Sequence, residues 1–313
     1  MNMARAIQAQ LRPASGPRVQ ILSDLHLEVC QQYTSYHFPS SAPLLLLGGD
    51  IGRLIDYEGY RRFLEAQVAR YRKVFLVLGN HEFFGLDYDA GLAQARRLAA
   101  EPSLAAGLVL LHKTRWDDPG SGLTILGCTL WSALPDDSHD LVRTSVSDYA
   151  HIHAWTPARH NEVHADEVAW LREQVAQLAS GGRQEQGRAR RLLVATHHAP
   201  CVKGTSRPEH AASPLSFAFA TDLVHEKAWA WAGVKVWVFG HTHFSTSFTQ
   251  NGIRLVANQR GYVLPGGKAL ENESKAEGRQ AFDAAKFVTL KDFWSNAQAS
   301  CLAFVSKRRP EAL

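Results

Sequence analysis

Side chains that bind metal ions occur in short clusters, and each cluster follows a run of apolar residues. The clusters hold Asp24 and His26, Asp50, Asn80 and His81, His197 and His198, and His241 and His243. An apolar run that ends in Gly, Asn, Asp or His is typical of a buried strand that opens onto a cleft. Strands that end at one edge of a sheet bring together side chains that are remote in sequence. We therefore expect these clusters to build one metal site.

The spacing within the clusters differs in how strongly it indicates a metal. In Gly240-His241-Thr242-His243 two imidazoles stand two residues apart, so on an extended chain they share one face. Asp-x-His and Gly-Asp are weaker signals, because either residue could instead cap a turn or form a surface pair. Carboxylate oxygen, imidazole nitrogen and amide oxygen together suit Mn, Fe, Zn or Ni better than Ca.

Apolar runs and helical periodicity place these clusters in an α/β pattern. Strands are expected at residues 19–22, 44–47, 74–78, 108–111, 123–126, 192–195, 234–239 and 253–257, with an edge strand at 287–290. Helices are expected at residues 57–72, 88–100 and 156–178, the last with Thr156 as its N-cap. The stretches 108–126 and 234–257 look like hairpins and predict mixed sheets. The polar segment 133–156 is expected to be a long loop, and residues 133–160 are expected to shape the pocket.

Composition excludes several classes of protein. The 313 residues carry a net charge of +4, which is too small and too scattered to indicate a nucleic-acid polymer as a partner. No apolar run is long enough to span a bilayer, so no membrane association is expected. The four cysteines are far apart and form no C-x-x-C pair, which favours a reducing compartment and predicts a cytoplasmic protein.

The chain is expected to form a single domain of residues 18–290. A flexible leader at residues 1–17 precedes it, and a C-terminal extension at residues 291–313 follows it. Residues 1–23 contain three arginines and no acidic residue, a composition that also occurs in transit peptides. The sequence gives no indication of the oligomeric state.

In their order along the chain, the clusters resemble the motifs of the calcineurin-like metallophosphoesterases. That family's pattern is Asp-x-His, Gly-Asp, Gly-Asn-His-(Asp/Glu), a lone His and Gly-His-x-His. It is matched here by Asp24-Leu25-His26, Gly49-Asp50, Gly79-Asn80-His81-Glu82, His197 and Gly240-His241-Thr242-His243. The resemblance covers residues 18–265, and the stretches SDLHLE, GNHEFFG, THHAP and NQRGY look like a subgroup of small cytosolic members of undefined substrate. It implies a four-layer αββα sandwich, in which two mixed sheets pack face to face and helices flank them.

By this resemblance, seven residues hold two divalent metal ions. Asp24, His26, Asp50 and His243 would hold the first ion, and Asp50, Asn80, His197 and His241 would hold the second, so that Asp50 bridges them. Seven ligands are too many for one catalytic ion, which keeps open positions, but they suit two ions of Mn, Fe, Zn or Ni. Two carboxylates together with two divalent ions leave a charge of about +2 on the metal site, so a phosphate ester is the expected substrate.

The expected reaction is metal-dependent hydrolysis of a phosphoester. A water shared by the two metals becomes the attacking hydroxide, because metal binding lowers the pKa of water from about 15.7 toward about 7. His81 is not assigned to a metal, and we expect it to donate a proton to the leaving oxygen or to steady the phosphoryl charge. A purely supporting hydrogen bond is the alternative role for His81. We favour a small substrate, either a phosphodiester such as a cyclic nucleotide or a phosphomonoester.

Other polar side chains have weaker assignments. Protein Ser/Thr phosphatases carry an Asp three residues after the bridging one, where this chain has Arg53, and this difference disfavours a phosphoprotein phosphatase. Arg53 could help to hold a phosphate or lie on the surface, and Arg260 could approach the cleft. His198 is expected to be structural or to line the cleft wall. His160 and His164, spaced i and i+4, are interpreted as solvated surface.

Two other classes of function remain open. Some members of this fold have lost metal ligands and serve as scaffolds in protein assemblies, whereas all seven ligand positions are filled here. Nucleases of this fold usually carry additional DNA-binding domains and a strongly basic surface, and this sequence shows neither.

Overall fold

Four apolar runs near the start of the chain and one short strand near its end form the first of two sheets. The computed structural model describes residues 16–180, 190–210, 213–226, 228–263 and 280–290. The strand order of this first sheet is β11-β1-β2-β3-β4, with β1 Arg18–Leu22, β2 Leu44–Gly48, β3 Lys73–Val77, β4 Leu108–Leu111 and β11 Phe287–Thr289. Strands β1 to β4 are parallel, and β11 pairs antiparallel with β1 at the edge.

Later apolar runs form the inner strands of the second sheet. Its order is β5-β6-β7-β8-β10-β9, with β5 Thr114–Asp117, β6 Leu123–Cys128, β7 Arg191–Thr196, β8 Val234–Phe239, β10 Ile253–Ala257 and β9 Thr246–Gln250. The four inner strands are parallel, and the edge strands β5 and β9 pair antiparallel with their neighbours. Both sheets are therefore mixed.

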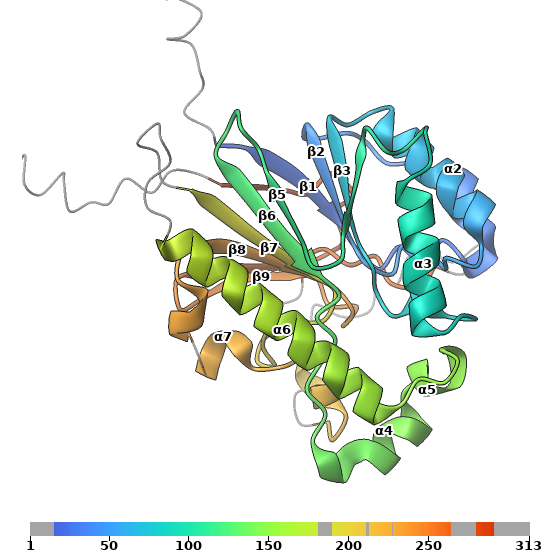
Figure 1. Cartoon of the computed structure of the whole chain (residues 1–313), viewed down its shortest axis with the longest axis vertical. Coiled ribbons are helices and arrows are strands. Elements are labelled where there is room, and N and C mark those ends of the chain that lie inside the picture. Colours follow the sequence, from blue (N-terminus) through green and yellow to red (C-terminus); the bar gives the residue numbers. More distant parts are fainter. Residues whose placement is uncertain (1–15, 181–189, 211–212, 227, 264–279, 291–313) are drawn as a thin grey trace, which may run out of the picture.

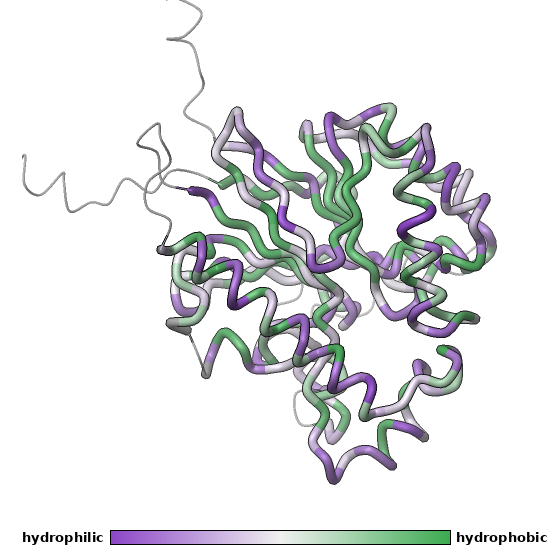
Figure 2. Tube along the Cα trace, in the orientation of Figure 1, coloured by the Kyte–Doolittle hydropathy of each residue, from purple (hydrophilic) through white to green (hydrophobic). Residues whose placement is uncertain are grey.

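Alternation of side chains along the strands separates the apolar layers. Val19 and Ile21 of β1 lie in one core between the sheets together with Leu193 of β7. Leu45 of β2 packs on the other face of the first sheet, and Val194 packs on the other face of the second. Figure 2 shows the apolar strands at the centre of the molecule and polar residues along the helices.

Helices cover the two outer faces and complete the expected four layers (Figure 1). The α-helices are α2 Tyr57–Val68, α3 Tyr88–Ala99, α4 His139–Ser145, α5 Asp148–His151, α6 Pro157–Ser180 and α7 Leu223–Glu226. Short 3-10 helices are η1 Val29–Thr34, η2 His81–Phe83, η3 Asp136–Ser138, η4 Pro208–His210, η5 Ser216–Ala218 and η6 Ala228–Trp231. Helices α2 and α3 lie on the first sheet and α6 and α7 on the second, whereas α4 and α5 lie at one end. Thr156 caps α6 as predicted, since its hydroxyl accepts the Arg159 N–H at 3.2 Å.

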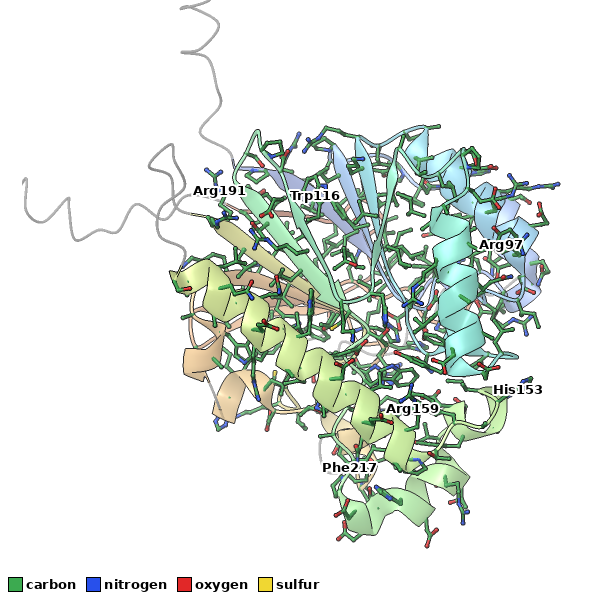
Figure 3. The ribbon with its side chains drawn as sticks, viewed as in Figure 1. Arg97, Trp116, His153, Arg159, Arg191 and Phe217 are labelled. Carbon is green, nitrogen blue, oxygen red and sulfur yellow. The ribbon has the colours of Figure 1, made fainter. Side chains whose placement is uncertain are left out.

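The chain passes from the first sheet to the second through the two residues between β4 and β5. Trp116 of β5 closes the gap beside this link, because its ring packs edge-on against Phe75 of β3 with centroids 4.8 Å apart (Figure 3). The two sheets are thus in contact near the point where the chain crosses.

Two hairpins were predicted wrongly. Strand β4 belongs to the first sheet, and the hairpin partner of β6 is the additional strand β5. Strands β8 and β10 are parallel, and β10 forms its hairpin with the additional strand β9. Both additional strands are polar edge strands with few buried residues, so no apolar run marks them in the sequence.

The sequence predicted a long loop at residues 133–156. This prediction was wrong, because the segment contains η3, α4 and α5. These helices have three, seven and four residues, which is too short for a periodic apolar pattern. Val142 of α4 instead packs against Leu134 and against Ala218 of η5, in a small core separate from those of the sheets. Tertiary contacts therefore fix these helices.

His160 and His164 are buried, so their interpretation as solvated surface was wrong. They are 1% and 8% exposed. His160 Nε2 accepts the Ser132 N–H at 3.2 Å, and His164 Nδ1 donates to the Leu130 carbonyl at 2.8 Å. This face of α6 covers the turn after β6, whose backbone polar groups need buried partners.

Other sequence predictions lie outside the described residues. The leader, apart from residues 16 and 17, and the extension 291–313 belong there. None of the helices in the described ranges is long and apolar enough to cross a membrane.

We predict that Glu167 of α6 makes the stability of the protein depend on pH. Burial raises the pKa of this carboxyl from its ordinary 4.5 to about 8. The folded protein then keeps a proton that the unfolded chain releases, so the free energy of unfolding falls as the pH rises through this window. Relative to wild type, Glu167→Gln should gain about 1.4 kcal/mol of unfolding free energy per pH unit there.

Urea unfolding at about pH 5.5 and about pH 7.5 measures this difference. Glu162→Gln is the matched control, because Glu162 lies on the same helix and its side chain is 67% exposed. A stability difference between wild type and Glu167→Gln that does not change with pH would contradict the prediction.

Candidate metal centre

The carboxyl ends of five strands deliver the seven predicted ligands to one place. Asp24 and His26 follow β1, Asp50 follows β2 and Asn80 follows β3; His197 follows β7, and His241 and His243 follow β8. The first three strands belong to one sheet and the last two to the other. The predicted convergence of distant strand ends is therefore present in the fold.

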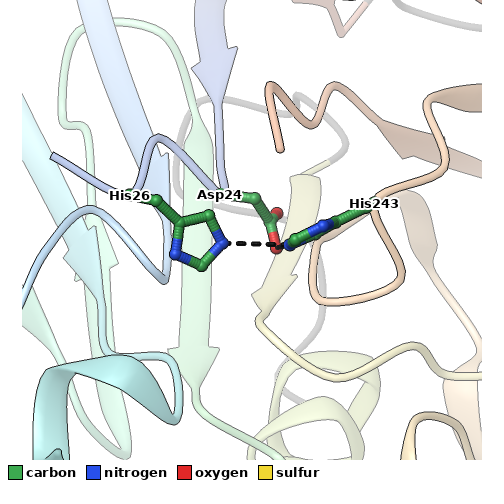
Figure 4. A group of neighbouring side chains, drawn as sticks. All are labelled: Asp24, His26 and His243. Carbon is green, nitrogen blue, oxygen red and sulfur yellow. Dashed lines mark hydrogen bonds and ion pairs between the residues drawn. The ribbon is translucent and has the colours of Figure 1, made fainter. Parts of the chain in front are cut away.

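Atoms of the first predicted set approach one another closely. His26 Nε2 lies 2.9 Å from His243 Nε2, and His243 Nε2 lies 3.6 Å from Asp24 Oδ1. Figure 4 shows these three side chains pointing toward one another. His26 Nε2 also lies 3.8 Å from Asp50 Oδ2. Such an arrangement of nitrogen and oxygen atoms suits the ligand shell of one cation.

The second predicted set meets the first at Asp50. His197 Nε2 lies 3.4 Å from Asp50 Oδ2 and 3.1 Å from Asn80 Oδ1. His241 joins Asp50 and His197 in a group whose ligand atoms all lie within 4.8 Å of one another. The same oxygen, Asp50 Oδ2, thus lies next to an imidazole of each set.

Burial tests whether a cation fits these residues. Asp24 and His241 are 0% and 9% exposed, and the structure gives Asp24 Oδ2 and His241 Nε2 no hydrogen-bond partner among the described residues. Buried polar atoms without a partner are costly, and a cation would satisfy both. His243 has a side chain that is 29% exposed, so the group opens to solvent on this side.

The backbone is strained at most of the predicted ligands. Positive φ angles occur at Asp24, His26, Asp50, His241 and His243, between 47° and 72°. A residue with a Cβ reaches this left-handed region at a cost of about 1 kcal/mol or more, and such strain concentrates at functional sites. The strain turns each side chain out of its strand direction and toward the common centre.

Glycines beside the ligands make room for the cluster. A Cβ on Gly79 would overlap with Asp50 Oδ1, and a Cβ on Gly49 would overlap with the ring of His197. Gly49 also has φ +89°, which disfavours any other residue there. The glycines of the Gly-Asp and Gly-Asn-His motifs are thus required by the packing of the ligands themselves.

Glu82 connects two of the ligand loops from beneath. Its buried carboxylate accepts the N–H groups of Asp50 at 2.9 Å, Ile51 at 2.8 Å and Gly79 at 2.6 Å, and the Tyr60 hydroxyl at 2.9 Å. The turns after β2 and β3 are held together by one side chain. This contact explains the acidic residue that ends the Gly-Asn-His-Glu motif.

Two further contacts orient ligand atoms. Asn80 Nδ2 donates to Asp148 Oδ1 of α5 at 2.7 Å, which leaves the amide oxygen facing the cluster. His197 Nδ1 lies 3.0 Å from the Gly48 carbonyl and donates to it, so Nε2 is the nitrogen that faces Asp50 and would bind a cation. Sequence reasoning missed Asp148, because only the fold brings α5 over the end of β3.

The charges in the cluster shift the pKa values of its ligands, so that His197 holds a proton where a cation would bind. Burial lowers the pKa of His197, but the charges of Asp50 and Asp24, together with the hydrogen bonds to Asp50 and to the Gly48 carbonyl, raise it to about 10. Burial likewise raises the pKa of Asp50, whereas the charges of His197 and His81 hold it well below its ordinary value. Imidazole binds metals in its neutral form, so a cation bound here would displace a proton.

The sequence also matches a known family over most of its length. The profile of the calcineurin-like phosphoesterases matches residues 17–245. The chain belongs to the calcineurin-like phosphoesterase family. Members of this family bind divalent metals, and the cluster provides candidate ligands for them.

Individual relatives of this phosphoesterase are distant. An uncharacterised protein of Acanthamoeba polyphaga mimivirus is 26% identical over 268 residues, which are 78% of this chain and 91% of that protein. The phosphopantetheinyl hydrolase of Mycobacterium tuberculosis has a similar fold, with a TM-score of 0.56 and 21% identity over 80% of this chain and 91% of that one. A dimetal phosphatase from Danio rerio has a TM-score of 0.47 and 13% identity, covering 88% and 99% of the two chains.

His81 of the phosphoesterase is held at both ring nitrogens. Nδ1 lies 3.0 Å from Glu28 Oε1, and Nε2 lies 3.1 Å from the Tyr262 hydroxyl. Glu28 Oε1 is also 3.0 Å from His26 Nδ1, so one carboxylate contacts both rings. Burial raises the pKa of Glu28, but the hydrogen bonds from His26 and His81 lower it to about 2, which keeps it ionised. Glu28 and Tyr262 were missed, although the stretches SDLHLE and NQRGY contain them.

A cavity of about 460 Å³ lies against the cluster. One part is lined by Asp50, Asn80, His81, His241, His243 and Tyr262. The remainder is lined mainly by side chains from residues 202–210 and 213–220, and by Ser147 between α4 and α5. The segment 133–156 therefore contributes to the pocket wall, as the sequence predicted.

Neither arginine that was considered for the cleft lines this cavity. Arg53 pairs with Asp56 at 3.1 Å, beside the start of α2. Arg260 donates to the Leu25 carbonyl at 3.1 Å and to Gln32 Oε1 at 2.8 Å, so it braces the segment after β1. His198 is fully buried, and its ring lies 4.1 Å from that of His241, in agreement with its structural interpretation.

Asp148→Ala should weaken metal binding by about 10- to 100-fold, because the Asn80 amide loses the partner that orients its oxygen. Competition between the protein and a chelator for Mn²⁺ measures the affinity. Asp140→Ala is the matched control, since Asp140 lies on the neighbouring helix α4 with a side chain that is 96% exposed. Equal affinity of Asp148→Ala and wild type would show that this contact does not support the site.

Proposed function

We propose that this phosphoesterase hydrolyses a small phosphoester with a dinuclear metal centre. Asp24, His26, Asp50 and His243 would hold one ion, and Asp50, Asn80, His197 and His241 the other. The observation that supports this most is the position of Asp50 Oδ2, 3.8 Å from His26 Nε2 and 3.4 Å from His197 Nε2. Bound there, two divalent ions of Mn, Fe, Zn or Ni would supply Lewis acidity and an activated water.

The charge of the loaded site favours an anionic ester. Two carboxylates, Asp24 and Asp50, leave a charge of about +2 on two divalent ions. The cavity of about 460 Å³ suits a small molecule, either a phosphodiester such as a cyclic nucleotide or a phosphomonoester. We propose a cytoplasmic location from the scattered cysteines.

We infer that His81 acts on the leaving oxygen of the ester. It lines the cavity beside Asp50 and Asn80. Glu28 accepts the proton of Nδ1 and so fixes the ring, whereas Nε2 faces the half-exposed Tyr262 hydroxyl. A substrate that displaces the hydroxyl would receive the Nε2 proton. In protein phosphatases an Asp three residues after the bridging Asp pairs with the corresponding His, and Glu28 provides that carboxylate here.

Metal removal and loss of Asp50 test the dinuclear function. EDTA should abolish hydrolysis of p-nitrophenyl phosphate or bis-p-nitrophenyl phosphate, and added Mn²⁺ should restore it. Asp50→Asn should lower kcat by at least about 100-fold and reduce the bound metal per chain, as elemental analysis measures. Asp136→Asn, with a fully exposed side chain, is the control.

The same assays separate the other classes of function. A purified protein that binds no metal and hydrolyses neither ester would favour a scaffold. Hydrolysis of long single-stranded nucleic acid in preference to both small esters would favour a nuclease.

The role of His81 can be tested by comparing two esters whose leaving groups differ in their need for a proton. His81→Asn should lower kcat by about 100-fold or more on phenyl phosphate, and by less on p-nitrophenyl phosphate, whose leaving group needs a proton less. His153→Asn is the matched control, because His153 is exposed at the end of the α5 region (Figure 3). An equal loss on both esters would instead leave His81 with a supporting hydrogen bond only.

A further inference from the structure

The cavity continues from the metal cluster to a second wall with its own charge. This wall comes from residues 202–210 and 213–220, between β7 and α7, and contains Arg207 and His210. Arg207 is the one arginine or lysine among the described residues that line the cavity. The cluster and Arg207 therefore place two positively charged groups on one cavity once metals are bound.

The guanidinium of Arg207 has unused hydrogen-bonding capacity. Its side chain is only 23% exposed, and its ion pair is a 3.8 Å contact with Glu209, which is itself 56% exposed. Within the described ranges, the structure gives the guanidinium no hydrogen bond. Arg260, by contrast, donates to two oxygens. An arginine whose side chain is partly buried beside a cavity, with free donors on its guanidinium, is suited to a phosphate or carboxylate ligand.

Apolar side chains form another part of the cavity lining. Phe219 stacks on His241 with ring centroids 4.8 Å apart, and Val202 and Leu215 also line the cavity. Phosphoryl groups do not bind to such a surface, whereas an alkyl or aromatic portion of a substrate does. The cavity therefore offers apolar contacts in addition to its two charged parts.

Contacts with the rest of the fold hold this wall in place. The Val202 N–H donates to Asp222 Oδ1 at 2.9 Å, and the Thr205 hydroxyl donates to the Cys201 carbonyl at 2.6 Å. On the outer side, Leu215 and Phe219 pack against the small core around Val142 of α4. Arg207 is therefore presented by a packed segment.

We propose that the substrate of this phosphoesterase carries a second anionic group, which Arg207 binds, and that an apolar portion joins this group to the scissile phosphoryl. The proposal rests on the proposed function, since the metal cluster must bind the phosphoryl end. It narrows the substrate class to esters with two separated anionic groups. A simple monoester of a neutral alcohol would leave Arg207 without a partner.

Binding of phosphonates that cannot be hydrolysed tests this proposal without relying on turnover. Butane-, hexane- and octane-bisphosphonate are compared with the alkylphosphonates of equal chain length, by calorimetry on the metal-loaded protein at fixed free Mn²⁺. At least one bisphosphonate should bind about tenfold or more tightly than its partner, because it also forms a charged contact with Arg207. In Arg207→Gln the ratio should fall to about one. Arg143→Gln, on the exposed face of α4, should keep the wild-type ratio.

The outcomes separate this inference from the proposed function. Binding of alkylphosphonates without any gain for the bisphosphonates overturns the second anionic group, while the metal site stands. A gain that survives Arg207→Gln overturns the role of Arg207. An equal loss of both ligand types in Arg207→Gln would place this arginine on the first phosphoryl group and also overturn the proposal. If no phosphonate binds the metal-loaded protein, the proposed function itself fails.

Discussion

The position of one carboxylate, that of Asp50, determines how the rest of the site is built. Its Oδ2 faces imidazoles from both sheets, and its Oδ1 accepts the His81 N–H at 2.9 Å. Its own backbone N–H is held by Glu82. Strands β1 and β3, on either side of β2, bring the neighbouring loops to it in parallel. Without this central anion, His26 and His197 would lose the one carboxylate oxygen that both of them face.

The same arrangement has a cost in the folded protein. Left-handed backbone at five ligand positions and buried polar atoms without partners both lower stability. Binding of cations to the folded state alone would offset this cost, because any ligand that binds only the native state stabilises it. The strain and the unsatisfied atoms are thus understandable as features of a protein that folds around metal.

Much of the fold and of the site could be predicted from the sequence. The inner strands are buried apolar runs, and the motif residues stand directly at their carboxyl ends. The polar edge strands β5 and β9 could not be recognised, because their residues are set by pairing with a neighbour and show no apolar pattern. The supporting residues Glu28, Asp148 and Tyr262 were not predicted from the sequence for a related reason. Each acts on a ligand or on His81 through a contact that exists only in the tertiary fold.

The buried face of α6 shows a similar limit to what polar residues in a sequence can indicate. The spacing of His160 and His164 is equally compatible with solvent and with a buried polar interface. The turn after β6 decides between them, since it presents backbone groups at Leu130 and Ser132 that require partners. A helical pattern alone contains no information about such a turn.

The core between the two sheets has a further consequence for metal binding. Asp24, His26, Asp50 and Asn80 belong to the first sheet, and the three other candidate ligands belong to the second. The spacing of the two sheets, which is set by side chains such as Ile21 and Leu193, therefore also controls how closely the two halves of the candidate ligand set approach each other. A change of volume in that shared core would alter metal affinity from afar, without touching any donor atom.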